Sequence, residues 1–186
     1  MLEVEVKYRA ADWDRVRAKL VEWSAVADPP REDTDHYFNA PDRDFAKTDE
    51  AFRLRRIGAR NYFTYKGPKR DAATKTRTEI ELALEPGDGD ATKAVRMLIA
   101  LGYRPVAVVS KTRTVYAFRR DSFDLEACLD DVGSVGRFVE LEIQATEAEY
   151  ELAKETLLKT AEELGLGEQE RRSYLEMLLD PGERGA

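Results

Sequence analysis

Short segments in which charged and apolar residues alternate recur along most of this chain of 186 residues, and they constrain its fold more than any other feature. The first of them, LEVEVKYRA at residues 2–10, places Glu3, Glu5 and Lys7 on one face of a strand and aliphatic residues on the other. Alternation with a period of two is typical of a β-strand with one apolar face. The sequence therefore predicts a fold built mainly from strands.

The same alternation is found in AFRLRRI, NYFTYK, RTEIELAL, SKTRTVYAF, SFDLEACLD and RFVELEIQ. Helical spacing of apolar residues is found in DWDRVRAKLVEW, ATKAVRMLIALG, EAEYELAKETLLKTAEELG and EQERRSYLEMLLD. We therefore expect one α+β domain over residues 1–186, mainly antiparallel β, with helices packed outside and C-terminal helices over residues 147–180.

The charged faces of these strands allow two arrangements. If the sheet closed around its aliphatic face, the charged residues would simply be solvated. In the other arrangement a barrel turns its charged face inward and the helices cover its aliphatic face, because helices with one apolar stripe need such a surface. The interior would then be a hydrated tunnel, since unpaired buried charges cost several kcal/mol each. Its lining would contain Lys7, Arg53, Arg55, Lys66, Lys111 and Arg113 together with Glu3, Glu5, Glu79, Glu81, Asp130, Glu140 and Glu142.

The two signs of charge point to a substrate with several phosphates. Basic side chains, and the arginine fork above all, suit the non-bridging oxygens of a phosphate chain. Carboxylates in Glu-x-Glu pairs project side by side from one strand and offer hard oxygen ligands to Mg²⁺ or Mn²⁺. These ions commonly bridge protein carboxylates and substrate phosphates. A substrate with several phosphates therefore accounts for both sets of residues.

Composition excludes several other classes of protein. The net charge of −7 argues against general nucleic-acid binding, because duplex binders usually carry a dominant basic field. There is no apolar run near the roughly 20 residues that cross a bilayer, and the N-terminus does not resemble a signal peptide. We therefore expect a cytoplasmic protein with neither membrane nor nucleic acid as partner. Cys128, the single cysteine, agrees with a reducing compartment and is interpreted as a small residue on a strand.

Several segments carry a resemblance to one family. EVEVK at residues 3–7 resembles the Glu-x-Glu-x-Lys signature of the CYTH superfamily, the triphosphate tunnel metalloenzymes. The likeness continues in order through DHYFNAPDRDFAKTDEAFRLRR, TYKGPK, TRTEIE, SKTR, LDDVGSVGRFVELE and RRSYLEMLL. The resemblance implies an eight-stranded antiparallel β-barrel with a hydrophilic tunnel and an activity that depends on Mg²⁺ or Mn²⁺. The KGP turn and the closing RRSYLEMLL are most similar to the class IV adenylate cyclase branch.

Residue roles follow from the resemblance position by position. The residues that match the phosphate-binding bases of the family are Lys7, Arg53, Arg55, Lys66, Lys111 and Arg113. Those that match its metal-binding acids are Glu3, Glu5, Asp130, Glu140 and Glu142, and Glu79 and Glu81 fit the same acidic wall without an assigned role. Lys7 with Tyr37 or Tyr174 matches a pair that orients water in some relatives. Which of Arg53 and Arg55 contacts phosphate stays open, and Arg77, Asp124 and Glu126 are interpreted as rim residues.

Three functions are compatible with these residues. A cyclase would convert ATP to cyclic AMP and pyrophosphate, whereas a triphosphatase would direct water at the terminal phosphorus of tripolyphosphate, thiamine triphosphate or a nucleotide. A binding module would hold the triphosphate without reaction, but a pure anion binder gains little from seven carboxylates beside its ligand. The expected partner is a small triphosphate-containing molecule, and a homodimer is the oligomer that we consider.

Overall fold

The computed structural model describes residues 2–10, 12–70 and 74–180. The ends of the domain expected over residues 1–186 thus lie outside the described residues. The chain divides into two compact units. Unit 1 consists of Met1–Arg31, Lys69–Arg77 and Thr112–Arg171, and unit 2 consists of Glu32–Pro68, Thr78–Lys111 and Arg172–Ala186.

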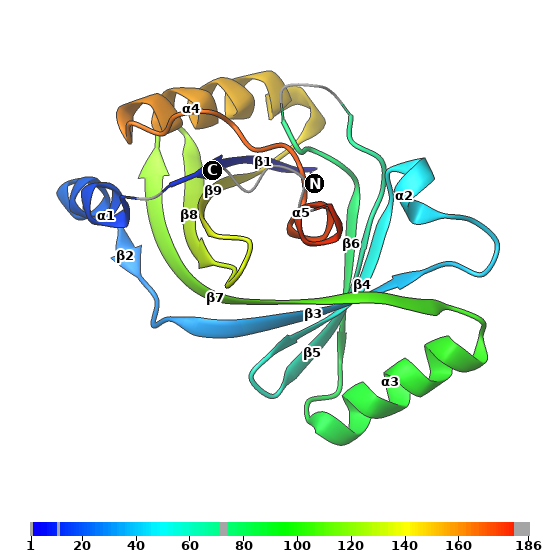
Figure 1. The fold of residues 1–186 in the computed structure, drawn as a ribbon. Helices are drawn as coiled ribbons and strands as arrows, with labels where there is room; N and C mark the ends of the chain where they lie inside the picture. The colour runs from blue at the N-terminus through cyan, green and yellow to red at the C-terminus, as the bar shows by residue number, and fades with distance from the viewer. Residues whose placement is uncertain (1, 11, 71–73, 181–186) are drawn as a thin grey trace. The chain divides into compact units, whose positions relative to one another are not determined.

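The strands are β1 (Leu2–Arg9), β2 (Val26–Ala27), β3 (Arg31–Asn39), β4 (Ala51–Ile57), β5 (Arg60–Lys66), β6 (Glu79–Leu84), β7 (Arg104–Arg120), β8 (Phe123–Asp131) and β9 (Arg137–Ala145) (Figure 1). The helices are α1 (Trp13–Glu22), α2 (Phe45–Thr48), α3 (Asp88–Ala100), the 3₁₀ turn η1 (Glu147–Glu149), α4 (Tyr150–Glu163) and α5 (Tyr174–Leu179).

The main strand order is β1-β9-β8-β7-β3-β4-β5-β6, and β2 pairs with β7 outside this path. The strand pairs with a determined register are antiparallel, including β1 with β9, β4 with β5 and β7 with β8. The expected α+β class, an antiparallel sheet of eight strands with helices packed on it, is therefore confirmed.

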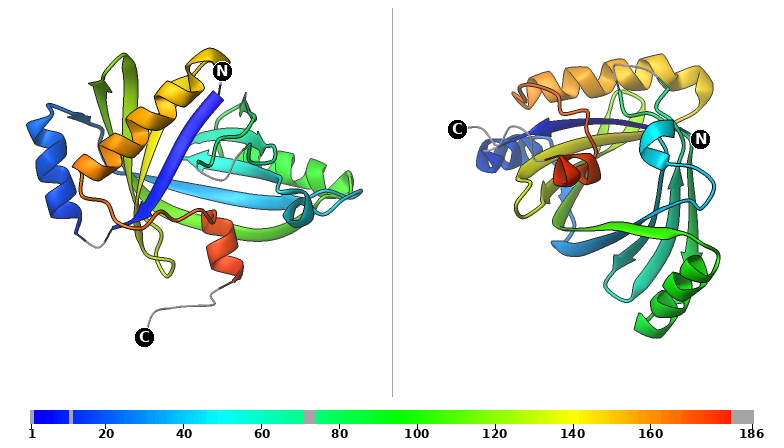
Figure 2. Two further views of the ribbon diagram at one scale, coloured as in Figure 1. Left: turned by 90° about the horizontal axis from the view of Figure 1, so that it is seen from above. Right: turned by 45° about the vertical axis from the view of Figure 1, so that its right-hand side comes forward.

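In unit 1 the aliphatic face of the sheet is covered by helices. Val4 and Val6 of β1 and Leu141 of β9 pack with Leu157 and other residues of α4, and Leu20 of α1 joins the same core. Helix α4 lies across the strands of this unit, as Figures 1 and 2 show. The alternation of β1 thus leaves its charged residues on the opposite face.

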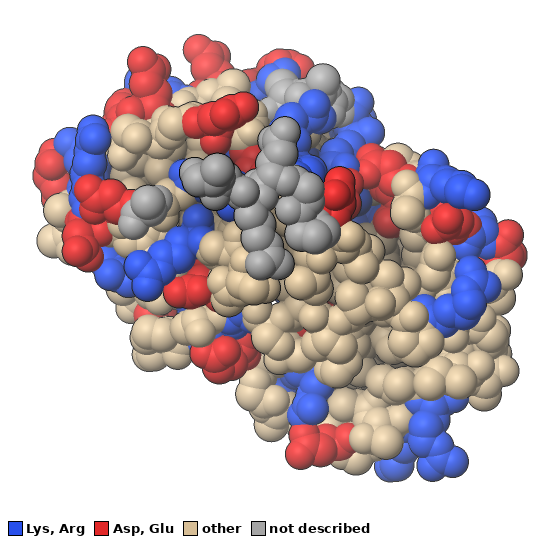
Figure 3. All heavy atoms as spheres, in the orientation of Figure 1, with Lys and Arg blue, Asp and Glu red and all other residues tan. Residues whose placement is uncertain are grey.

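The outer surfaces of the helices of unit 1 carry charges of both signs. Acidic and basic side chains lie next to one another over α1 and α4 (Figure 3). On α1 these include ion pairs of Lys19 with Glu22 and of Arg17 with Asp14. Exposed pairs of this kind contribute little to stability, and we assign them a role in solubility.

In unit 2 the sheet packs on α3. Phe38 of β3 and Leu54 of β4 form a small core with Ala91 and Leu98 of α3, and partly buried aromatic residues surround it. Phe52 contacts the rings of neighbouring aromatic residues at 5.3–6.4 Å between centroids. The apolar face of this unit is therefore also covered by a helix.

Two local expectations were wrong. The last helix begins at Tyr174 and not within EQER, because Ser173 caps it by accepting a hydrogen bond from the Glu176 backbone at 3.1 Å. On β6 the expected aliphatic face is covered only in part, since Ile80 and Leu82 are each 60% exposed. Within the described ranges, no helix combines the length and apolar character needed to cross a membrane.

Candidate active site

Strand register builds the charged face of unit 1. Glu5 of β1 lies opposite Glu142 of β9, which lies opposite Glu126 of β8. The next row along the same face consists of Lys7, Glu140 and Cys128. Because side chains two residues apart share a face, three separate strands bring their polar residues to one surface.

This face is largely removed from solvent. Lys7 and Asp130 are fully buried, and Glu5 and Glu140 are only 6% and 5% exposed. Buried charges of this kind are tolerated only when they are paired and hydrogen-bonded. The polar face of unit 1 is therefore no ordinary solvated surface, which contradicts the solvated arrangement for this part of the chain.

Arg113 of β7 braces the carboxylates. Its Nε donates to Asp130 Oδ1 at 2.7 Å and its Nη2 donates to Asp130 Oδ2 at 2.6 Å, which makes a bidentate pair. The same Nη2 also donates to Glu140, and Nη1 lies 3.6 Å from Glu142 Oε1. One planar guanidinium thus holds three of the acids that the family resemblance assigns to metal binding.

The negative charges of the carboxylates on this face are only partly offset by the neighbouring basic side chains. Burial, together with the charges of Glu3, Glu5 and Glu140, raises the pKa of Glu142 to about 8, against the opposing effect of Arg113. Since like charges raise the pKa of a carboxyl group, this position favours a proton or another cation. The face is thus able to accept additional positive charge.

Lys7 is perturbed in the opposite direction. Burial, followed by the positive charge of Lys75, lowers the pKa of Lys7 to about 7 although three carboxylates act against this shift. Its ammonium lies 5.6 Å from the centre of the Phe138 ring. A lysine with such a pKa exists partly as the neutral amine near neutral pH.

Lys75 is a member of this face that the periodicity could not indicate, because it belongs to the connection between β5 and β6. Its Nζ donates to Glu5 Oε1 and lies 3.6 Å from Glu140 Oε1. Arg77, interpreted from the sequence as a rim residue, is only 7% exposed and forms an antiparallel bridge with Glu3.

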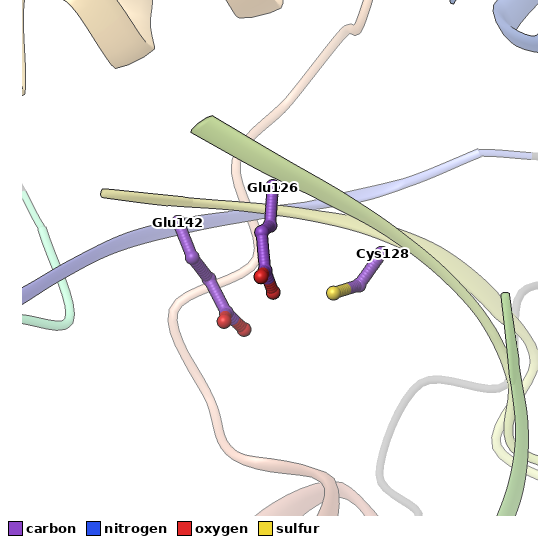
Figure 4. A group of neighbouring side chains, drawn as sticks. All are labelled: Glu126, Cys128 and Glu142. Carbon is purple, nitrogen blue, oxygen red and sulfur yellow. The ribbon is translucent and has the colours of Figure 1, made fainter. Parts of the chain in front are cut away.

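Figure 4 shows a group formed by Glu126, Cys128 and Glu142, whose side chains point toward a common space. Each offers one ligand atom within 4.8 Å of the others. Burial raises the pKa of the Cys128 thiol, so that it stays protonated near neutral pH and is a weak metal ligand. The carboxylates therefore remain the main candidates for holding a metal.

A second set of charges lies on the polar face of unit 2. Arg55 Nε and Nη2 donate to the two oxygens of Asp35 at 2.7 and 2.9 Å, and Arg53 Nη1 donates to Asp35 Oδ2 at 3.1 Å. Arg53 Nη1 also donates to Tyr37 Oη at 3.2 Å. Burial alone would raise the pKa of Asp35, but the two arginines hold it well below its usual value.

Further along this face, Lys66 Nζ forms an ion pair with Glu79 Oε2 at 2.5 Å. Glu81 accepts a hydrogen bond from Thr64 at 3.4 Å. Lys111 is 3% exposed, and its ammonium lies 5.2 Å from the centre of the Tyr174 ring. Apart from Asp35 and Lys75, both faces are thus built from residues of the expected kinds, at positions that strand alternation indicated.

The two units divide the expected site residues between them. Unit 1 contains Glu3, Glu5, Lys7, Arg113, Asp130, Glu140 and Glu142. Unit 2 contains Tyr37, Arg53, Arg55, Lys66, Glu79, Glu81, Lys111 and Tyr174. The metal-binding acids expected from the resemblance therefore all belong to unit 1.

Sequence reasoning missed Asp35 and Lys75 and set Cys128 aside. Asp35 stands two residues before Tyr37, so its phase could have revealed it, and Cys128 is likewise in phase with Asp130. Asp124, which was also interpreted as a rim residue, is exposed and pairs with Arg119 at 3.2 Å. For Lys75, strand alternation offered no signal.

The chain matches the family model of the CYTH domain over residues 1–174. A protein of Methanocaldococcus jannaschii, provisionally named an adenylate cyclase, is 35% identical over 180 residues, which cover 95% of this chain and 98% of that protein. A solved structure from Pyrococcus horikoshii is 37% identical with a TM-score of 0.81, covering 95% of this chain and 98% of that one.

The fold is shared more widely. A Hippeastrum protein described as an adenylyl cyclase candidate with a dominant triphosphatase activity superimposes with a TM-score of 0.67 at 16% identity, over 96% of this chain and 94% of that one. At this identity the likeness concerns the fold alone. The charged strand faces and the full-length matches together define the class: this chain belongs to the CYTH family.

Proposed function

We propose that this protein is a metal-dependent enzyme that acts on the triphosphate group of a small molecule, and that its reaction is the conversion of ATP to cyclic AMP and pyrophosphate. The observation that carries the proposal is the buried face of unit 1, where Glu5, Asp130 and Glu140 lie beside Lys7 and Arg113. The name of the Methanocaldococcus jannaschii relative supports the choice of reaction.

The acids of unit 1 fit a divalent metal. Carboxylate oxygens are the hard ligands that Mg²⁺ and Mn²⁺ prefer. The raised pKa of Glu142 supports this assignment, because a divalent cation would offset the crowded negative charge. The residues that would hold it are Glu3, Glu5, Asp130, Glu140 and Glu142. When bound, the metal would polarise phosphoryl oxygens as a Lewis acid.

The bases are assigned to the phosphates. Lys66, Lys111 and Arg113 would neutralise the triphosphate chain, and Lys7 would donate a hydrogen bond to it. Arg53 is assigned to phosphate as well, because its buried Nε has no hydrogen-bond partner among the described residues. Arg55, which donates twice to Asp35, is assigned to bracing that carboxylate. A guanidinium with a spare donor is suited to an anionic oxygen.

We assign catalytic roles to Lys7 and Tyr37, and we assign the proton transfer to Lys7. A general base must be available in its neutral form near the working pH, and the pKa of Lys7 near 7 meets this requirement. Tyr37 keeps its hydroxyl hydrogen free to donate, because its Oη accepts from Arg53. In a cyclase the proton would come from the attacking ribose hydroxyl.

Hydrolysis of a triphosphate is the second candidate. It is favoured by the activity described for the Hippeastrum protein of the same fold, and the same bases would then act on water. The substrates would be tripolyphosphate, thiamine triphosphate or a nucleotide. Binding without catalysis is a third candidate, against which the large number of carboxylates weighs.

Product analysis separates these reactions. The purified protein is incubated with ATP, tripolyphosphate and thiamine triphosphate, each in Mg²⁺ and in Mn²⁺. We expect cyclic AMP and pyrophosphate from ATP. Release of orthophosphate from any of the three would instead assign the hydrolase, and intact substrates in both metals would leave only the binding module.

A further inference from the structure

Residues 74–77, the segment that carries Lys75, are bound to the edge of β1. The Lys75 backbone N–H donates to Glu5 O at 2.9 Å, and Arg77 forms a bridge with Glu3. Thr74 adds a hydroxyl contact of 2.7 Å to Thr76. The backbone of this segment is therefore fixed beside the strand that carries the Glu-x-Glu pair.

This anchoring directs the Lys75 side chain between two carboxylates. Its ammonium hydrogen-bonds to Glu5 and lies 3.6 Å from Glu140 Oε1. The Lys75 side chain is 9% exposed, and those of its two partners are 8% and 6% exposed. A buried positive charge of the protein itself thus lies between two oxygens that we assign to the metal.

We propose that Lys75 is a tethered cation that occupies the metal position between Glu5 and Glu140 and has to withdraw when a divalent cation binds. The inference rests on the proposed function, because it presumes that these carboxylates bind metal. It deepens that function by making metal binding a competition between an ammonium group and the ion.

Two physical reasons support competition. Mg²⁺ and Mn²⁺ need the oxygen lone pairs that the ammonium now uses, and Mg²⁺ requires close contacts of about 2.1 Å in a nearly octahedral arrangement. An ammonium and a divalent ion that share one carboxylate would also repel each other strongly at low dielectric. The lysine stem is flexible, so the side chain can withdraw while the backbone contacts to β1 remain.

The positive charge of Lys75 also opposes metal binding through its effect on the surrounding carboxylates. Its ammonium hydrogen-bonds to Glu5 and lies 3.6 Å from Glu140 Oε1, so it raises the local electrostatic potential at these two acids. A higher potential weakens the binding of any further cation. Removal of this charge should therefore strengthen the binding of free metal.

The test measures Mn²⁺ binding to the full chain without substrate, by electron paramagnetic resonance of the free ion and by calorimetry. Lys75→Met keeps most of the apolar stem and removes the charge. We expect it to bind Mn²⁺ at least about tenfold more tightly than the wild type. Lys19→Met removes a partly exposed, ion-paired lysine of α1 and should leave the affinity unchanged.

Stability measurements supply a second readout. Without metal, Lys75→Met should melt below the wild type because it leaves Glu5 and Glu140 without this cation, and Mn²⁺ should raise its Tm more than that of the wild type. Lys75→Gln, which retains hydrogen-bond donors, serves if the methionine variant does not fold. The glutamine variant should also bind Mn²⁺ more tightly.

The outcomes distinguish this inference from the proposed function. Equal or weaker Mn²⁺ binding by a folded Lys75 variant, with clear binding by the wild type, would overturn the inference and leave the metal site intact. Absence of Mn²⁺ binding from the wild type and both variants would overturn the metal site itself and the inference with it. Binding that appears only in the variants would support the competition directly.

Discussion

Individual carboxylates in unit 1 interact with a lysine or arginine of the protein, and in our proposal they also bind a metal. Glu5 is the clearest example, since it is buried and accepts from Lys75. Across the strands it lies opposite Glu142, so that two carboxylates share this position. The function of such a residue is therefore best tested by a change that keeps its shape.

We expect Glu5→Gln to reduce turnover severely, because it removes one charged ligand of the metal while it retains the size of the side chain. Activity is measured with saturating Mg²⁺ or Mn²⁺, and circular dichroism checks the fold. Glu22→Gln on α1 is the control and should retain wild-type turnover. The assignment of Glu5 as a ligand would be wrong if the variant kept full activity that chelator cannot remove.

Asp35 illustrates a structural role at the residue scale. It compensates both Arg53 and Arg55 in unit 2. Asp35→Asn should therefore lower the free energy of unfolding by about 3–5 kcal/mol, the usual result of leaving buried charges uncompensated. Denaturant titration measures this loss. Asp42→Asn, at an exposed pair with Arg43, should change stability by less than about 0.5 kcal/mol.

The same carboxylate predicts a dependence of stability on pH. The pKa of Asp35 is lower in the folded than in the unfolded protein, so the unfolded state binds more protons as the solution becomes acidic. The stabilisation is fully present above the unfolded pKa of about 4 and is lost progressively below it. The free energy of unfolding, measured by urea denaturation between pH 6 and about 2.5, should fall less steeply with decreasing pH for Asp35→Asn than for the wild type. Parallel curves would contradict the assignment.

At the scale of elements, α5 shows how a short helix depends on its cap. Six residues are too few for a stable isolated helix, so the capping box formed by Ser173 and Glu176 contributes much of its local stability. The helix also positions Tyr174 over the ammonium of Lys111. Loss of the cap should thus affect both the helix and a residue of the polar face.

Ser173→Ala should lower the free energy of unfolding by about 1 kcal/mol, the typical effect of removing a serine cap. Thermal denaturation measures the change, and hydrogen exchange should show faster exchange of the backbone amides in α5. Ser122→Ala is the control, because Ser122 lies in the turn between β7 and β8 and its hydroxyl does not cap a helix. Equal effects of both variants would refute the capping role.

At the scale of the whole molecule, the proposed function predicts that a triphosphate ligand stabilises the folded chain. Tripolyphosphate with Mg²⁺ should raise the Tm, because a ligand that binds only the folded state adds about 2.7 kcal/mol of stability at a concentration of 100 Kd. Glu5→Gln should lose the part of the shift that depends on metal. No shift in the wild type at millimolar ligand would argue against a triphosphate site.

Much of the fold could be predicted from local patterns. Period-two alternation located the charged residues of β1, β4, β7, β8 and β9 on common faces, because strand geometry alone determines which side chains share a face. The apolar stripes of α1, α3 and α4 were equally readable. The helix expected over EQERRSYLEMLLD was too long, since its start depends on the capping geometry at Ser173.

The sequence by itself determined most of the strands, though not β3, most of the acids and bases on their polar faces, and the family. Only the tertiary structure decided which charges meet. Arg113 proves to hold Asp130 and Glu140, and Lys75 reaches Glu5 from a connection that has no periodicity. The physical reason is that alternation is a local property of one strand, whereas these contacts join residues as far as 70 positions apart and depend on register and loop path.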